Sequence, residues 1–156
     1  MKSSSLSLLK KELEILPSAQ LVELCTRIAK YRKENKELLN YLLFESHDEE
    51  RYIKSIKIEV EQLFKEINTS NIYFAKKSIR KILRLVNKHS KYSGIKTTVV
   101  ELLIHFCQQI NVVKIDYKKS PALLNLYNKQ LAKINNLVSV MHEDLQYDYQ
   151  RELLTL

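Results

Sequence analysis

Basic side chains are concentrated in one stretch of this sequence, and the chemistry open to them is the binding of anions. The segment AKKSIRKILRLVNKHSKYSG, at 75–94, contains seven Lys or Arg and no acid. From Ile67 to Val100 there is no Asp or Glu, and the rest of the chain holds equal numbers of basic and acidic residues. The formal charge of +8 is therefore a property of one segment, as expected of a surface for an anionic partner.

The helical period places these cations on one side of a predicted helix at about 72–92. At 100° per residue they occupy an arc of about 140°, and the apolar residues from Ala75 to Val86 lie nearly opposite. The cationic face consists of Lys76, Lys77, Arg80, Lys81, Arg84, Lys88 and Lys91. Tyr73 falls within the arc and Tyr92 at its edge, so both are candidates for stacking on bases or on a partner's side chains.

Two interpretations of the cationic face stay open. A solvated face usually mixes charges, because like charges one turn apart repel each other. The arc could be neutralised by acids of the preceding helix or be merely a solvated face, or it could bind an anionic partner. The acids in question are Asp48, Glu49, Glu50, Glu59 and Glu61. The candidate partners are nucleic acid or an acidic protein segment, and the lack of any known nucleic-acid-binding motif favours recognition by charge and shape.

Residues with catalytic potential are scattered. The four histidines are His47, His89, His105 and His142, and no two of them have the spacing of a metal site. Glu101 and His105 are one helical turn apart, which is more typical of a polar pair at the rim of a core than of a general base with its partner. No glycine loop or nucleophile motif is present. We therefore expect no enzyme, no metal and no cofactor.

The composition predicts an all-α chain. One glycine and two prolines among 156 residues leave few turns of the kind that strands require. We expect about seven helices in a single domain over 1–156, with antiparallel helical hairpins stacked as a bundle or as a short HEAT-like superhelix. The segment 31–37 is the expected turn between the second and third helices, and Gly94 should end the basic helix.

The end of the chain is expected to form one long helix that begins at Pro121. Its apolar residues alternate by three and four, which fits a dimer seam or an ordinary core helix. The members of this seam are Leu124, Tyr127, Leu131, Ile134, Val138, Met141 and Leu145. The sequence therefore leaves monomer and homodimer undecided.

The remaining features indicate a cytoplasmic protein that does not insert into a membrane. No apolar run approaches the length of a bilayer span, and Cys25 and Cys107 stand in apolar surroundings, as core residues of a reducing compartment would. The leading prediction is a non-catalytic α-helical interaction module, a scaffold or adaptor for a protein partner, with an acidic protein as one candidate. The alternative is a nucleic-acid-binding accessory protein that uses the basic helix.

Overall fold

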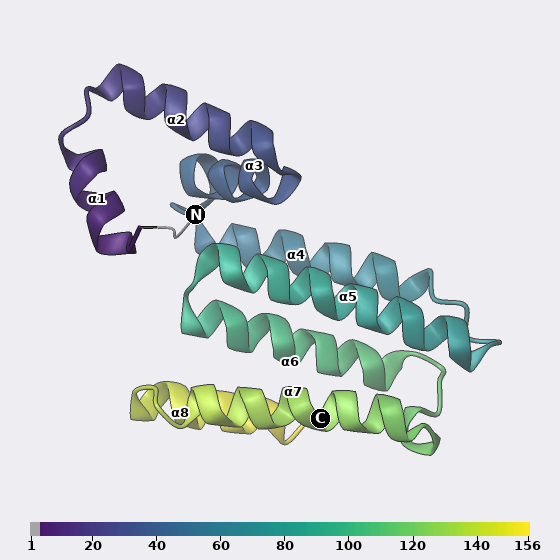
Figure 1. The fold of residues 1–156 in the computed structure, drawn as a ribbon. Helices are drawn as coiled ribbons and strands as arrows, with labels where there is room; N and C mark the ends of the chain where they lie inside the picture. Colours follow the sequence, from purple (N-terminus) through teal and green to yellow (C-terminus); the bar gives the residue numbers. More distant parts are fainter. Residues whose placement is uncertain (1–3) are drawn as a thin grey trace. The chain divides into compact units, whose positions relative to one another are not determined.

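The chain is all-helical. The computed structural model describes residues 4–156, which contain eight α-helices and no strand (Figure 1). The helices are α1 (Leu6–Glu14), α2 (Ser18–Tyr31), α3 (Lys33–Asn40), α4 (Glu49–Lys65), α5 (Ile72–Ser93), α6 (Lys96–Val112), α7 (Pro121–Val138) and α8 (Glu143–Leu153), with a π-helical turn at Tyr41–Glu45 and a 3₁₀ turn at Tyr117–Lys119. Each of these helices is too short or too polar to cross a bilayer. The all-α prediction is confirmed.

The described chain divides into two compact units, Met1–Phe44 and Glu45–Leu156. The prediction of one domain over 1–156 stays a prediction.

The unit Met1–Phe44 contains α1, α2 and α3, and α2 packs against α3. The expected turn at 31–37 is wrong, because only Arg32, in an extended conformation, separates these two helices. None of the three helices has a buried residue. Cys25 is exposed, so its prediction as a core residue is also wrong. Large apolar side chains that are exposed in this unit are Leu6, Leu8, Leu9, Leu13, Ile15, Val22, Leu24, Ile28, Tyr31, Leu42, Leu43 and Phe44.

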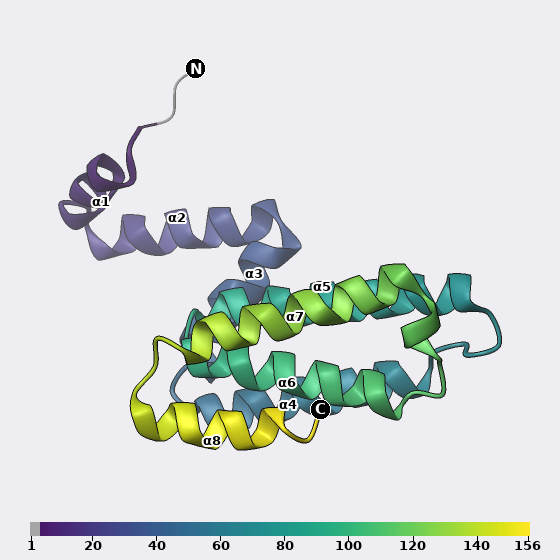
Figure 2. The ribbon, with the colours of Figure 1, turned by 90° about the horizontal axis from the view of Figure 1, so that it is seen from below.

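The unit Glu45–Leu156 is a helical bundle built around α6. Helices α4 and α5 lie on one side of α6, and α7 and α8 lie on the other (Figures 1 and 2). Consecutive helices from α4 to α7 run antiparallel and pack against each other, as expected for a helical bundle. The rings of Phe64 in α4 and Phe106 in α6 lie 5.7 Å apart in the core.

The sequence of α6 explains its central position. An apolar residue occupies nearly every side of this helix, as expected for a helix buried all round. Its buried residues are Thr98, Val100, Leu102, Leu103, Ile104, Phe106, Cys107 and Ile110. Cys107 is fully buried, as predicted, and burial raises the pKa of its thiol to about 12.

The last expected helix is two helices, α7 and α8, with a turn between Val138 and Glu143. Met141 lies in that turn and Leu145 is an exposed residue of α8, so the expected seam is not one continuous stripe. Its remaining members face the unit's own core: Tyr127, Ile134 and Val138 are buried, and Leu124 and Leu131 are half-buried. The ordinary core helix is the interpretation that this packing supports.

Candidate anion-binding face

The caps at both ends of α5 fix the length of the basic helix. At its start, the Asn71 side chain accepts a hydrogen bond from the Tyr73 amide at 2.9 Å. At its end, Gly94 adopts a left-handed conformation (φ 68°), and its amide donates to the Ser90 carbonyl at 3.0 Å. Glycine accepts this conformation without a steric penalty, so the predicted end of the helix is confirmed. Between the caps, α5 holds 22 residues in one uninterrupted helix.

One face of α5 is buried in the core of the bundle, where the helix packs against α4 and α6. Its buried residues are Ala75, Ile79, Ile82, Val86 and Ser90, whereas Leu83 is half-buried. The Tyr52 hydroxyl of α4 lies 2.8 Å from His89 Nδ1 of α5 and joins the two helices beside this core. The burial fixes the rotation of α5 about its axis and turns the opposite side outward.

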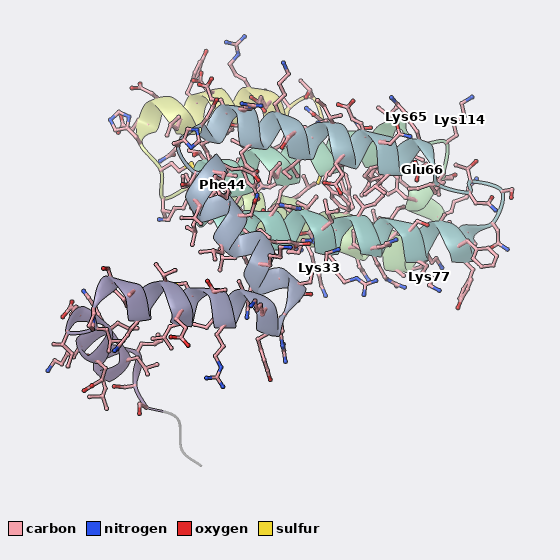
Figure 3. All side chains as sticks on the ribbon, turned by 90° about the horizontal axis from the view of Figure 1, so that it is seen from above. Lys33, Phe44, Lys65, Glu66, Lys77 and Lys114 are labelled. Carbon is pink, nitrogen blue, oxygen red and sulfur yellow. The ribbon has the colours of Figure 1, made fainter. Side chains whose placement is uncertain are left out.

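The outward side of α5 is the cationic face that the sequence predicts. Lys77, Arg80, Lys81, Arg84 and Lys91 are exposed, and Lys76 and Lys88 are half-buried. In the described chain, none of the exposed cations of this face forms an ion pair with a carboxylate. Figure 3 shows Lys77 on the outer side of α5, pointing away from α4. The face is a continuous row of cations, with at least one in every turn.

Three of the five acids in question, Asp48, Glu49 and Glu61, contact groups other than the exposed cations of α5. Glu49 accepts hydrogen bonds from the hydroxyls of Ser93 (2.5 Å) and Thr98 (2.6 Å), and Asp48 accepts one from the Arg51 amide. Glu61 lies 3.4 Å from His105 of α6. In the described chain none of these carboxylates pairs with Lys77 or its exposed neighbours on α5, so they do not neutralise the exposed cations of this face.

A further cation from α7 extends the face. Lys133 Nζ donates to the Asn87 side chain of α5 at 3.0 Å. Burial lowers the pKa of Lys133, and the nearby charge of Lys91 lowers it further. Nothing in the sequence signals this approach, because Lys133 and Asn87 are 46 residues apart and their helices each pack against α6.

Exposed aromatic rings stand at the start of the cationic face. Tyr73 and Phe74 form an edge-to-face pair with ring centroids 5.5 Å apart. Phe74 was missed from the sequence, although the same helical projection places it at the edge of the arc. Tyr92, the other predicted stacking residue, is half-buried; its ring packs edge-on against His89, and the Lys88 ammonium lies 5.9 Å from its centre. Tyr73 and Phe74 therefore offer more ring surface than Tyr92.

Glu101 and His105 do not form a pair of their own. Lys57 Nζ lies 2.9 Å from Glu101 Oε2, and His105 Nε2 lies 3.2 Å from the Lys57 carbonyl oxygen and 3.4 Å from Glu61. Burial lowers the pKa of His105, and the charge of Glu61 opposes this shift. These contacts hold α4 against α6. Within residues 4–156, no three His, Cys, Asp or Glu side chains are grouped as metal ligands would be.

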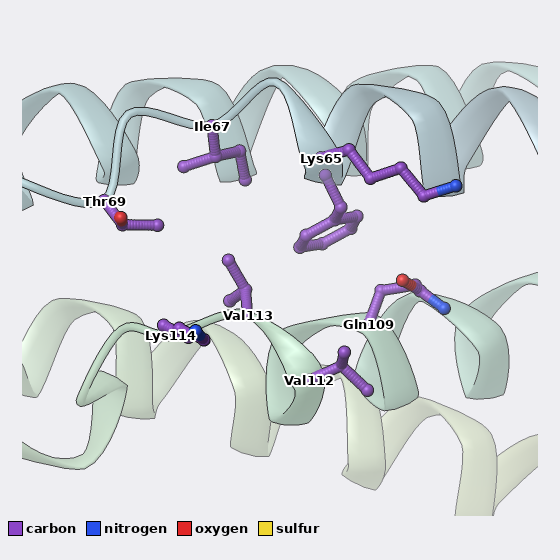
Figure 4. A pocket seen from close by; sticks show the side chains of 8 residues that line it. Lys65, Ile67, Thr69, Gln109, Val112, Val113 and Lys114 are labelled. Atoms are coloured by element: carbon purple, nitrogen blue, oxygen red, sulfur yellow. The ribbon is translucent and has the colours of Figure 1, made fainter.

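A shallow hollow of about 330 Å³ lies between the C-terminal ends of α4 and α6 (Figure 4). Phe64, Ile67, Val112 and Val113 form its apolar wall. Lys65, Thr69, Gln109 and Lys114 complete the lining, which includes no His, Cys, Asp or Glu. Such a lining offers neither a general base nor a set of metal ligands.

Comparisons of the chain with protein-family models, with curated proteins and with solved structures gave no match.

Proposed function

We propose that the protein is a non-catalytic helical interaction module that binds a polyanionic partner through the cationic face of α5. The observation that carries the proposal is a row of five exposed cations that form no ion pair with a carboxylate in the described chain: Lys77, Arg80, Lys81, Arg84 and Lys91. The prediction that the protein is not an enzyme forms part of the proposal.

The energetics of α5 favour a partner of opposite charge. Lys77 with Lys81 and Arg80 with Arg84 are like-charge pairs one turn apart, and each such pair destabilises a helix by about 0.2–0.5 kcal/mol. The caps and the buried apolar face hold the helix together in spite of this repulsion. An anionic partner would reverse the sign of the interaction, because each of its charges attracts several cations at once. Binding should therefore stabilise the bundle.

Heparin is a suitable first probe, because it is a flexible polyanion that presents charge without bases or a peptide backbone. We would measure the affinity of labelled heparin for the protein by fluorescence anisotropy at low salt. The triple variant Lys77→Glu, Arg80→Glu, Arg84→Glu should lose most of the binding. The matched control reverses Lys65, Lys114 and Lys118, which are also exposed and give the same change in net charge. Figure 3 shows Lys65 and Lys114 on the opposite side of the unit from Lys77.

The control separates a local site from a general effect of charge. The proposal expects the control variant to keep its affinity to within a few-fold of the unmodified chain. If both variants lost binding equally, the interaction would depend on net charge and the cationic face would have no special role. No binding by the unmodified chain at low salt would also reject the proposal.

A second candidate function is self-association through the unit Met1–Phe44. This unit exposes a dozen large apolar side chains, and its three helices have no buried residue. Units near 40 residues rarely bury enough apolar surface to be stable without oligomerisation or staples. A second copy of the unit would supply a matching apolar surface, as in a twofold symmetric interface.

Light scattering at several concentrations tests this candidate. Leu9→Glu with Ile28→Glu should shift a dimer to monomer, whereas Ile58→Glu, at an exposed position of α4, should not. A monomer at every concentration would reject self-association.

A further inference from the structure

The aromatic pair and the cationic face occupy the same side of α5. Tyr73 is 68% exposed and Phe74 is 51% exposed, which is unusual for large rings beside a packed core. Residues three and four positions apart on a helix are neighbours on its surface. Lys77 therefore follows both rings by one turn, and the rest of the cationic face continues in line from it.

The two kinds of side chain suit different parts of one ligand. Flat rings are stacking platforms for unpaired bases, and a row of cations follows a phosphate backbone. From Tyr73 to Lys91 the helix spans about 27 Å at 1.5 Å per residue, long enough for several nucleotides. In a duplex the bases are already stacked on each other, and their faces are not accessible to a ring on a surface helix.

We infer that the polyanionic partner is a single-stranded nucleic acid, whose phosphates lie along the cationic face and whose bases stack on Tyr73 and Phe74. This inference rests on the proposed function and adds the class of partner. The regular placement of cations in every turn of α5 supports it, since a nucleic-acid strand carries one charge at every nucleotide. Binding by charge and stacking is tolerant of sequence, in keeping with the lack of a known nucleic-acid-binding motif in the sequence.

The test compares the binding of three labelled polyanions to the same protein. The first is an unstructured single strand of about 20 nucleotides, made both as DNA and as RNA. The second is the matching duplex, and the third is a poly-glutamate peptide. Fluorescence anisotropy at one salt concentration gives the affinities. We expect the single strands to bind more tightly than the duplex, and poly-glutamate to bind most weakly.

Removal of the rings gives the decisive comparison. Tyr73→Ala with Phe74→Ala should weaken binding to the single strands about tenfold or more and should change binding to duplex and heparin by less than about twofold. Tyr73→Leu with Phe74→Leu keeps apolar bulk without a flat ring, so it should show the same loss and serves if the alanine variant fails to fold. Tyr147→Ala is the control, because Tyr147 is an exposed tyrosine of α8 outside the cationic face.

The outcomes distinguish this inference from the proposed function. If heparin binds through the cationic face but both ring variants bind single strands normally, the single-strand inference is wrong and the proposed function stands. If poly-glutamate binds as tightly as the single strands and also depends on the rings, the partner is an acidic protein segment. If heparin does not bind at all, the proposed function itself fails.

Discussion

The end of α5 offers a sharp test of the fold, because Gly94 must adopt a left-handed backbone conformation there. Its backbone is left-handed at φ 68°, and a Cβ added there would have no heavy atom within 4 Å. Gly94→Ala therefore creates no clash, and its cost is the strain of the left-handed backbone, about 1–2 kcal/mol for an L residue. Alanine also reduces the conformational entropy of the unfolded chain, which raises the free energy of unfolding by about 0.4–1 kcal/mol. We expect a net loss of about 1 kcal/mol in the free energy of unfolding.

Urea denaturation followed by circular dichroism measures this loss, with the slope of the transition as a check on two-state behaviour. Gly94→Asn is the matched variant: asparagine tolerates the left-handed region better than alanine, so it should cost less. A stability unchanged by Gly94→Ala would show that α5 does not end in a left-handed residue. A loss above about 3 kcal/mol would show that the added Cβ meets other atoms, contrary to the open space around Gly94.

Further predictions concern the two cysteines and one histidine. In the folded protein a maleimide should modify exposed Cys25 rapidly. Burial raises the thiol pKa of Cys107 to about 12, so Cys107 should react only on unfolding. Mass spectrometry of the labelled peptides checks both expectations, and fast labelling of Cys107 would contradict its burial. Because burial lowers the pKa of His105 in the folded state, the unfolded chain binds the proton more readily, so the free energy of unfolding should fall as the pH drops from about 7 to about 5. His105→Gln should flatten this dependence in urea titrations at several pH values, and an unaltered pH dependence would contradict the assignment.

The basic helix could be predicted closely from the sequence because its signals are local. The helical period, the apolar residues from Ala75 to Val86 and the lone glycine at position 94 all lie within one stretch of chain. The rotation of α5 follows from the same pattern, so the exposure of most of the cationic face agrees with the projection. Phe74 could have been included on the same basis.

Other features depend on contacts between distant residues and could not be read from the pattern. Lys133 approaches Asn87 only because α7 and α5 pack on the same central helix. Whether the acids of α4 face α5 or α6 depends on the rotation of α4, and Glu61 turns to His105 of α6. The break between α7 and α8 is masked by apolar spacing that continues through Met141 into α8.

The N-terminal helices show a different limit. By the helical period, Leu24, Cys25 and Ile28 lie on one face of α2, yet their side chains are exposed in the structure. Periodicity identifies an apolar face, but it does not identify what covers that face. The same limit applies to the seam from Leu124 to Leu145, because apolar residues three and four positions apart fit both a dimer and the core that the structure shows.

The central claim is that the cationic face of α5 binds a polyanion, and the salt dependence of binding tests it most directly. Each phosphate neutralised on a single strand contributes about 0.7 to the slope of log K against log salt. Engagement of Lys77, Arg80, Lys81, Arg84 and Lys91 predicts a slope of about −3 to −4 for the unmodified protein. The triple variant at Lys77, Arg80 and Arg84 leaves Lys81 and Lys91, so its slope should be no steeper than about −1.4. A slope near zero for the unmodified protein, or the same steep slope in the triple variant, would contradict the claim.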